Sequence, residues 1–233
     1  MILQVKDFNK RFGSSDVIKN VSFEVEKGKI FGVAGPNGAG KSTLFNLIAG
    51  MLPLDTGEII FNGKNINRLK SHQICHRGIS RTFQIPIVFS TMTISENIEV
   101  GIRFGAQMNP KGRIAEILNF VGLQEKGDVV AKHVNLLDKK LLMLAAALAA
   151  KPKLLLLDEP IGGLSPTEAV QTLTLFKKIN KQLGVTIIII EHLMKVIMEI
   201  AEKLMILNNG ENICIGPPRE VMQDNLVRKV YLG

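Results

Sequence analysis

The chain contains little of what would mark several large classes of protein. It has two cysteines, Cys75 and Cys214, in 233 residues, one tyrosine and no tryptophan. Two cysteines cannot form the disulfide framework of a small secreted protein, so we expect both to be reduced thiols. The longest uninterrupted apolar runs have about ten residues or fewer, such as Leu141 to Ala150, whereas a membrane-spanning helix needs about twenty.

Positive charge is in excess, but it is not gathered in one stretch. The net charge is +8, yet the basic residues form no long run and have few aromatic residues between them. Scattered lysines are typical of a solvated surface, so we do not expect nucleic acid as a partner. With 46% apolar residues the chain is predicted to be globular. Residues 1–8 alternate like a strand and do not resemble a signal peptide, which favours a cytosolic protein.

The most informative stretch is rich in glycine and ends in a lysine followed by two hydroxyl residues. An apolar run at 30–34 precedes it, and a helical stretch at 44–49, followed by Gly50, comes after it. Strand, glycine loop and helix are the setting that a phosphate loop of the form G-x-x-x-x-G-K-[ST] requires. We therefore predict that nucleotide phosphates are bound by Gly35, Pro36, Asn37, Gly38, Ala39, Gly40, Lys41, Ser42 and Thr43.

Each residue type in this loop has a physical task. Glycines let the backbone curl so that successive N–H groups point at phosphate oxygens, and the helix N-terminus adds positive potential. Lys41 is expected to reach the β- and γ-phosphates, and the Ser42 hydroxyl can be a ligand to Mg²⁺. The complete motif and both flanks disfavour the alternative, an incidental glycine-rich turn.

Strand and helix patterns alternate along most of the rest of the chain. Residues 2–8 and 21–26 alternate as half-buried strands do, whereas 154–157 and 185–190 are continuous apolar runs typical of parallel strands covered on both faces. Residues 87–150 have helical patterns without a convincing strand. Further strands are expected at 58–61, 79–83, 204–207 and 212–215, and helices at 68–76, 113–121, 135–150, 166–183 and 193–203.

These patterns predict an α/β fold in one domain, residues 1–233. We expect the nucleotide-binding core at 1–86 and 151–233, with a mostly parallel sheet and an antiparallel β edge. We expect residues 87–150 to form a helical subdomain inserted into this core. Ligands gather at the carboxyl ends of parallel strands, so residues that follow the buried strands are the candidates for chemistry.

Four polar side chains follow predicted strands and should meet the phosphate loop. Asp158, after four leucines, can hold Mg²⁺ directly or through water. Glu159 beside it can orient or deprotonate an attacking water. His192 ends the next strand, where its imidazole could reach a γ-phosphate. Gln84 sits at a strand-to-loop edge and can offer an oxygen to Mg²⁺ or to a water.

These motifs resemble, in order and spacing, the ATP-binding subunits of ABC transporters along nearly the whole chain. Residues 35–43 resemble the Walker A loop, and 154–159 resemble Walker B with its catalytic glutamate. Gln84 resembles the Q-loop glutamine, 163–165 the D-loop, and His192 the switch histidine. Phe12, in the phrase Arg11-Phe12-Gly13, resembles the aromatic residue that stacks on adenine, although ordinary packing is the alternative.

Within this superfamily, three phrases are similar to the branched-chain amino-acid uptake branch. They are Arg81-Thr82-Phe83-Gln84, Thr93-Ile94-Ser95-Glu96-Asn97 and Glu191-His192. The stretch 83–89 is also similar to urea and amide importers. The resemblance implies ATP and Mg²⁺ as cofactors, and ATP hydrolysis that drives an importer, with branched-chain or other hydrophobic amino acids as the expected solute.

The resemblance also implies partners. A second ATPase subunit, identical or different, would cap each phosphate loop with its signature helix. An integral-membrane permease would dock near residues 85–100. The chain would then lie peripherally on the cytoplasmic face of the cell membrane.

The chain departs from the family pattern in three places. The signature Leu-Ser-Gly-Gly-Gln falls on Val134, Asn135, Leu136, Leu137 and Asp138, so its serine and both glycines are replaced. Ser165 stands where the D-loop usually has aspartate, and Leu193 follows the switch histidine. Asn135 remains a good N-cap, but the Asp138 carboxylate would repel a phosphate unless lysines such as Lys139 and Lys140 compensate.

Two other classes of protein fit less well. A P-loop GTPase is disfavoured because residues 180–183 fail the Asn-Lys-x-Asp guanine motif, and a kinase has no need of Gln84, Glu159 and His192 together. ABC-type ATPases of DNA repair or translation carry long coiled-coil insertions or a second ATPase domain, and this sequence has neither.

Overall fold

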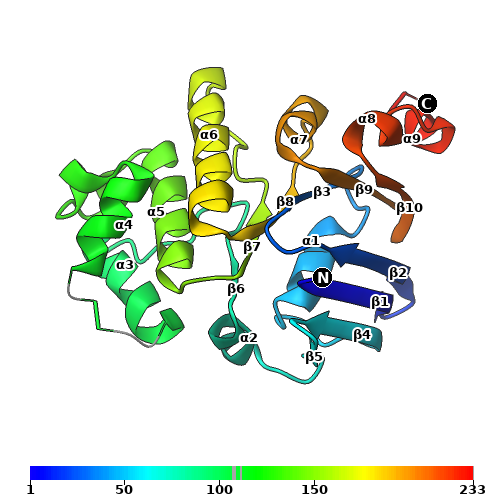
Figure 1. Cartoon of the computed structure of the whole chain (residues 1–233), viewed down its shortest axis with the longest axis horizontal. Coiled ribbons are helices and arrows are strands. Elements are labelled where there is room, and N and C mark those ends of the chain that lie inside the picture. Colours follow the sequence, from blue (N-terminus) through cyan, green and yellow to red (C-terminus); the bar gives the residue numbers. More distant parts are fainter. Residues whose placement is uncertain (107–108, 111, 233) are drawn as a thin grey trace.

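Two β-sheets form the framework of the protein in a computed structural model, which describes residues 1–106, 109–110 and 112–232 (Figure 1). The larger sheet has six strands in the order β10-β9-β3-β8-β7-β6. All its neighbouring strands are parallel except β10, which runs antiparallel to β9 at the edge. The strands are β3 (Ile30–Ala34), β6 (Ile79–Arg81), β7 (Leu154–Asp158), β8 (Thr186–Ile190), β9 (Lys203–Asn208) and β10 (Glu211–Gly216).

The smaller sheet is antiparallel and has four strands in the order β2-β1-β4-β5. Its strands are β1 (Leu3–Phe12), β2 (Ser15–Val25), β4 (Thr56–Phe61) and β5 (Lys64–Asn65). The expectation of a mostly parallel α/β core with antiparallel strands is confirmed. The half-buried strands near the N-terminus form their own sheet, however, because their alternating pattern provides one apolar face for packing and one face for solvent.

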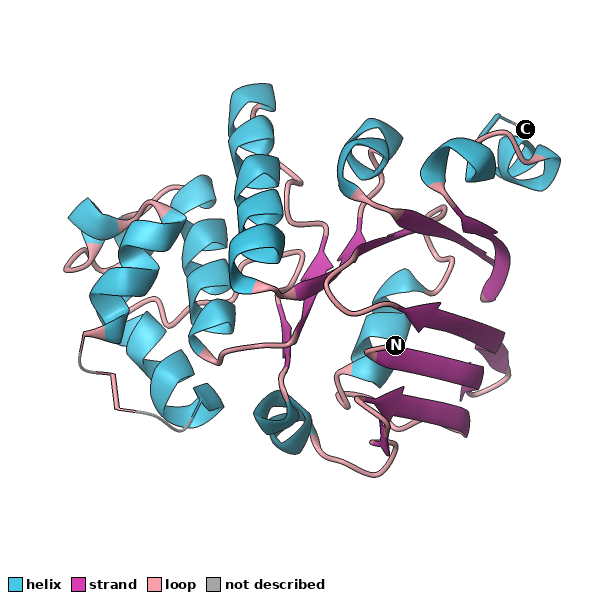
Figure 2. Ribbon diagram, viewed as in Figure 1, coloured by secondary structure: helices cyan, strands magenta, loops and turns pink. Residues whose placement is uncertain are grey.

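Helices cover both faces of the parallel sheet (Figure 2). Helix α1 lies between the two sheets, and α6 and α7 lie on the opposite face of the larger one. The helices of the core are α1 (Lys41–Ile48), α2 (Ser71–Arg77), α6 (Pro166–Leu183), α7 (Met194–Ile200), α8 (Pro218–Val221) and α9 (Asn225–Leu232). None of the helices in the described residues has the length and apolar character needed to cross a bilayer.

The segment 87–150 is helical, as its sequence pattern predicts. It contains α3 (Ile94–Val100), a π-helix η1 (Gly101–Ala106), α4 (Arg113–Val121), the 3₁₀ turns η2 (Gln124–Lys126) and η3 (Ala131–His133), and α5 (Leu136–Ala149). In Figure 1 these helices lie together at one end of the molecule, shown in green. Extended pairing within the segment is limited, among described residues, to one isolated bridge between Thr93 and Val130.

The helical segment shares its core with the sheet. Successive leucines of β7 point to opposite faces, as the period of two in a strand requires. Leu154 and Leu156 join the cluster that packs the smaller sheet and α1, whereas Leu155 and Leu157 join the cluster that contains the buried residues of α3, α4 and α5. Strand β7 therefore connects the two halves of the molecule through its own side chains.

Several element boundaries differ from the sequence prediction, most of all that of β2, which begins at Ser15 and not at residue 21. Two of the differences have a plain cause in the structure. β6 ends at Arg81 and not at Phe83, because the Phe83 N–H lies 3.4 Å from the Met143 sulfur instead of pairing with a strand. α7 ends at Ile200 and not at Lys203, because Lys203 already begins β9.

Candidate active site

The glycine-rich loop runs from the carboxyl end of β3 into the first turn of α1. Two of its glycines have no room for a side chain. A Cβ on Gly35 would lie 1.9 Å from the Leu207 carbonyl oxygen, and one on Gly40, at φ +102°, would lie 2.8 Å from the Val17 carbonyl oxygen. Gly40 is the N-cap of α1 and provides no capping side chain, so the N–H groups of the first turn can donate hydrogen bonds to the oxygens of a phosphate.

Lys41 folds back on the loop that it belongs to. Its ammonium group donates hydrogen bonds to the carbonyl oxygens of Gly35 at 2.7 Å and Pro36 at 2.8 Å, and the residue is buried. Burial lowers the pKa of the lysine, while the carboxylates of Glu159 and Asp158 act in the opposite direction. Two carbonyl oxygens of the loop thus hold the lysine side chain beside the loop.

A polar cavity of about 490 Å³ lies over the loop. Gln84, Glu159 and His192 line it together with Val17 and the loop residues 37–43. The structure therefore brings together the loop and three of the four strand-end residues that the sequence singled out. Gln84, Glu159 and His192 follow β6, β7 and β8, respectively, and these three strands are neighbours in the parallel sheet.

Glu159 is the most constrained residue of this cavity. Gln84 Nε2 donates to one of its carboxylate oxygens at 2.6 Å, and His192 Nε2 pairs with the other. Its backbone has φ +44°, a left-handed conformation that is costly outside glycine, and its N–H donates to the Ile190 carbonyl at 3.0 Å. The residue with this strained backbone thus also carries a carboxylate that lines the cavity over the phosphate loop.

Two buried charged groups support the turn that carries Glu159. Lys140 of α5 lies with its ammonium nitrogen 3.3 Å from the Glu159 carbonyl oxygen. Glu191 accepts a hydrogen bond from the Ile161 N–H at 3.1 Å. Burial raises the pKa of Glu191 to about 7, with a smaller contribution from the nearby Glu159. The turn that carries Glu159 is therefore held from a helix on one side and from the end of β8 on the other.

Asp158 lies at the end of β7, behind the cavity. Its Oδ2 accepts a hydrogen bond from Arg81 Nη2 at 2.9 Å, and both side chains are almost fully buried. Burial raises the pKa of the aspartate, and the guanidinium of Arg81 counteracts this effect. The other oxygen, Oδ1, is buried and has no hydrogen-bond partner in the part of the chain that the structure describes.

This orphaned oxygen fits a place in the shell of Mg²⁺. Within the described ranges no group of three or more His, Cys, Asp or Glu side chains could hold a metal by itself. Mg²⁺ is suited to such a site, because it usually keeps several waters and binds through one or two protein groups and the phosphates of a nucleotide. Asp158, Gln84 and the exposed Ser42 hydroxyl are the protein groups available at this place.

Comparison with known proteins agrees with this geometry. The model of the family described as ABC transporter matches residues 18–162. The chain belongs to the ABC transporter family. It is an ATP-binding subunit of this family, similar to the LivG branch, and such subunits are ATPases.

The relatives have related but different printed names. The high-affinity branched-chain amino acid transport ATP-binding protein LivG of Salmonella typhimurium is 32% identical, over 100% of this chain and 98% of that protein. The methionine import ATP-binding protein MetN of Clostridioides difficile is 33% identical, over 96% of this chain and 71% of that protein. The lipopolysaccharide export system ATP-binding protein LptB of Haemophilus influenzae is 30% identical, over 100% of this chain and 97% of that protein.

Solved structures have the same fold. The crystal structure of a nucleotide-free ATP-binding cassette from an ABC transporter covers 100% of this chain, with a TM-score of 0.89 and 32% identity, and 99% of that cassette is covered in turn. The crystal structure of the ADP conformation of MJ1267, an ATP-binding cassette of an ABC transporter, gives a TM-score of 0.90 at 31% identity, over 100% of this chain and 98% of that chain.

The signature-like turn of this ABC subunit forms a capped helix start. Asn135 accepts a hydrogen bond from the Asp138 N–H at 2.8 Å, and the Asp138 carboxylate binds Lys126 at 2.7 Å. Of the two lysines that the sequence offers as compensating charges, Lys140 points to the Glu159 carbonyl, and the structure pairs the Asp138 carboxylate with Lys126 instead. Leu136 is 41% exposed at the first position of the helix, and Leu137 is half-buried beside it.

Phe12 lies outside the residues that line the phosphate cavity. It ends β1, is 45% exposed, and has the Lys10 ammonium 5.4 Å from its ring centre. Because part of the Phe12 ring is exposed, a nucleotide base could stack on it. The stacking role of Phe12 stays a prediction.

Ser165, the residue at the usual place of the D-loop aspartate, is the N-cap of α6. It forms a capping box with Glu168, so this departure from the family pattern preserves the start of the helix.

Sequence reasoning gave Arg81, Lys140 and Glu191 no role beside Asp158 or Glu159, although each is an ionisable group next to the site. A partial signal was present: Glu191 directly follows the apolar strand β8, and Lys140 directly precedes the apolar run 141–150. Buried charges are rare and need partners, so such positions are worth following.

Proposed function

We propose that this chain binds and hydrolyses ATP to energise an importer for branched-chain or other hydrophobic amino acids. The observation that carries the hydrolytic part is the Glu159 carboxylate, held between Gln84 and His192 over the phosphate loop. The amino-acid part is supported by the similarity to LivG over nearly the full length of both chains. Other relatives are named for methionine import and lipopolysaccharide export, so the solute of this system has to be determined by experiment.

The proposed mechanism assigns each group a task. The loop N–H groups and Lys41 bind the β- and γ-phosphates, and Phe12 stacks on the base. Ser42, Gln84 and Asp158 would hold Mg²⁺, which supplies charge neutralisation of the phosphates when bound. Glu159 orients the attacking water and takes its proton, and His192 fixes the carboxylate and faces the γ-phosphate.

The direct test is Glu159→Gln, which keeps the shape of the side chain and one of its two acceptor oxygens but cannot accept a proton from water. We expect turnover in the assembled transporter to fall on the order of a hundredfold while ATP binding is retained, so that an ATP-bound dimer accumulates. Glu168→Gln, which changes a half-buried carboxylate in the capping box of α6, is the matched control. Near-normal turnover of Glu159→Gln would remove Glu159 from this role.

We further propose that the working unit is a pair of different ATPase subunits. In the resembling family the signature glycines let the helix start of one subunit approach the γ-phosphate that the other subunit holds. Leu136 and the pair Asp138–Lys126 occupy that place here, so a site capped by this chain would be weak. The site built on this chain's own loop, capped by an intact signature, would be competent.

The unequal pair is tested in the assembled transporter. The Walker lysine is changed to methionine first in this chain, as Lys41→Met, and then in the partner subunit. Loss of most ATPase activity in the first case only is the expected result. Equal losses from both changes, or a fast homodimer of this chain, would contradict the proposal.

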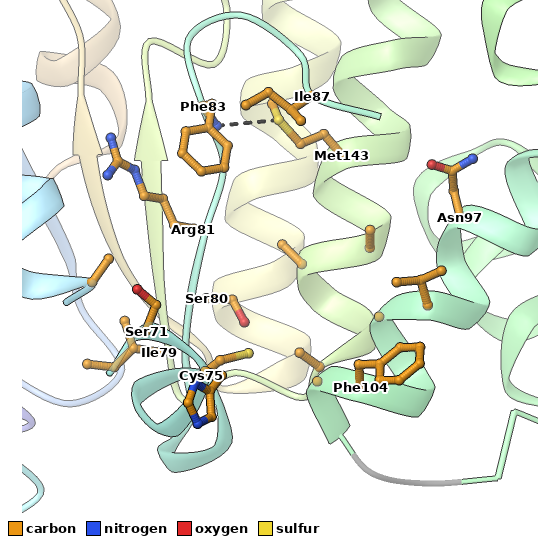
Figure 3. Close-up of a pocket in the computed structure, with 18 of the residues that line it drawn as sticks. Ser71, Cys75, Ile79, Ser80, Arg81, Phe83, Ile87, Asn97, Phe104 and Met143 are labelled. Atoms are coloured by element: carbon orange, nitrogen blue, oxygen red, sulfur yellow. Dashed lines mark hydrogen bonds between the residues drawn. The ribbon is translucent and has the colours of Figure 1, made fainter. Parts of the chain in front are cut away.

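The proposed permease site is an apolar groove of about 410 Å³ between the core and the helical segment (Figure 3). It is lined by α2, the segment after β6, α3, η1 and α5, and Figure 3 shows Ile87, Phe104 and Met143 around it. Ile87, Phe89 and Phe104 are 65%, 57% and 72% exposed. Exposed apolar groups gathered in this way are typical of an interface.

The segment that carries Ile87 and Phe89 is held in shape by Asn97. This buried side chain accepts from the Phe89 N–H at 2.8 Å and donates to the Phe89 carbonyl at 3.1 Å. Val88 packs on the helical core, whereas its two neighbours face outward. A permease docked here would place this subunit on the cytoplasmic face of the membrane.

Docking is tested by Ile87→Glu and Phe89→Glu, measured as co-purification with the permease and as nucleotide binding. Both variants should lose the permease and keep the nucleotide. Leu183→Glu, at an exposed apolar site on the end of α6, is the control. Retained co-purification of both groove variants would contradict docking at this place.

A further inference from the structure

Arg81 is a charged side chain with almost no contact with solvent. It is the last residue of β6, and its side chain is 8% exposed. Burial lowers the pKa of its guanidinium, while Asp158 raises it. A buried arginine needs several partners to compensate for its lost hydration, so the identity of these partners indicates what it does.

The guanidinium joins three parts of the molecule. Nη2 binds Asp158 of β7 at 2.9 Å, and Nη1 donates to the Asn46 side chain of α1, the helix that begins in the phosphate loop. Its two aromatic neighbours are Phe45 of α1, 5.7 Å from the guanidinium carbon to the ring centre, and Phe83 at 4.9 Å. A planar fork suits this geometry, because one guanidinium can bind two acceptors and stack on rings at once.

This arrangement divides the two oxygens of Asp158. Oδ2 is committed to Arg81, while Oδ1 is the oxygen without a partner among the described residues. A carboxylate fixed through one oxygen cannot turn freely, so Oδ1 stays available in one orientation. Groups that orient a metal ligand in this way affect metal affinity without touching the metal.

The other side of Arg81 belongs to the groove. Arg81, Phe83 and Met51 all line the apolar groove of Figure 3, where Arg81 and Phe83 lie next to each other. The Met51 sulfur is 3.5 Å from Nη1. One side chain thus contacts both the groove and the aspartate behind the phosphate cavity.

We propose that Arg81 is a positioning residue, which fixes the Asp158 carboxylate for Mg²⁺–nucleotide and links it to the packing of the groove. This inference rests on the proposed nucleotide function. It requires that Arg81 matter for nucleotide bound with Mg²⁺ and hardly at all for nucleotide bound without it, because the phosphate loop itself does not contact Arg81 through any hydrogen bond given for the described residues.

The experiment measures the affinity of the full chain for ADP, once with Mg²⁺ and once with EDTA. Arg81→Met and Arg81→Lys should each weaken binding of ADP with Mg²⁺ by roughly ten- to a hundredfold, as changes around a metal ligand do, and alter binding in EDTA less than about twofold. Lysine should fail because it cannot bridge Asp158 and Asn46 together. Arg103→Met, at an exposed ion pair with Glu99, is the control and should change neither affinity.

A milder variant keeps the test valid if Arg81 variants do not fold. Asn46→Ala removes the second anchor of the guanidinium and leaves the ion pair, so it should weaken Mg²⁺-dependent binding in the same direction by a smaller factor. Equal weakening with Mg²⁺ and with EDTA, or unchanged affinities in folded Arg81 or Asn46 variants, would overturn the inference. If the unmodified chain binds no ADP, the proposed function fails instead.

Discussion

Helices α1 and α5 begin in opposite ways, although both carry the positive end of a helix dipole. α1 begins at Gly40, without a capping side chain, and has a lysine folded over its loop. α5 begins after Asn135, which caps the helix, and its first-turn aspartate is neutralised by Lys126. The same physical element is open to a phosphate in one case and already occupied by local acceptors in the other.

The difference shows what makes a helix start into a binding site. Backbone N–H groups satisfied by a nearby side chain have little to gain from a ligand, whereas uncapped ones gain a full set of partners. Glycine provides this at Gly40 because it brings no acceptor of its own and allows φ +102°. Asparagine at 135 gives stability to the helix instead.

The largest expected effect comes from removing the lysine at the open helix start. Lys41→Met should lower ATP turnover on the order of a hundred- to a thousandfold, the size found when one preorganised donor to a developing charge is lost. Lys139→Met makes the same change near the start of α5 and should leave turnover of this chain's own site within about twofold. ATPase assays of both variants check this comparison, and similar losses would break it.

The next effect concerns Glu191, which lies within electrostatic reach of Lys140 of α5 and of Glu159 at the site. Its pKa is about 7 in the folded chain and ordinarily 4.5. Between these two pH values the unfolded chain releases a proton that the folded chain keeps, so the free energy of unfolding falls as pH rises through this window. The shift corresponds to at most about 3 kcal/mol.

Glu191→Gln removes this titration and retains an acceptor for the Ile161 N–H. The variant should therefore match the parent near pH 4 and be more stable above pH 7, by up to about 3 kcal/mol. Urea unfolding at several pH values measures it. Curves that stay parallel from pH 4 to pH 8 would show that Glu191 does not keep its proton in the folded state.

The next prediction concerns Phe12, which is expected to stack on the base of a nucleotide bound at the start of α1. No such stacking residue is expected for the start of α5. Phe12→Ala should weaken ATP and GTP binding similarly, by roughly 1–3 kcal/mol, since stacking is available to every base. Calorimetric titration gives both affinities. Phe104→Ala, at another exposed phenylalanine, is the control, and unchanged affinity in Phe12→Ala would assign this ring to packing alone.

The smallest effect is expected at the cap of α5. Asn135→Ala should lower the free energy of unfolding by about 1 kcal/mol, the usual value of an N-cap, without changing nucleotide binding to the isolated chain. Thermal or urea unfolding with a nucleotide titration checks both parts. A change in nucleotide affinity would mean that the two helix starts are not independent.

Local patterns in the sequence predicted most of the elements and the main groups of the site. The phosphate loop was predicted from its motif and flanks, and α4 and α6 were found at their predicted residues. Gln84, Glu159 and His192 were predicted to meet because each follows a strand of one parallel sheet, and the structure places all three around one cavity. Such predictions succeed where a function depends on residues that are close in the chain or at equivalent ends of strands.

The partners of charged side chains could only be found in the tertiary structure. The sequence places Arg81 and Asp158 77 residues apart, and nothing local in it pairs them. It also offered Lys139 and Lys140 as neighbours of Asp138, whereas the fold brings Lys126 to this carboxylate and turns Lys140 toward Glu159. The sequence by itself determined the phosphate loop, the strand ends and the altered signature, because these depend on residue type and spacing. The pairing of charged side chains depends on distances across the packed core, so only the tertiary structure decided which side chains are partners.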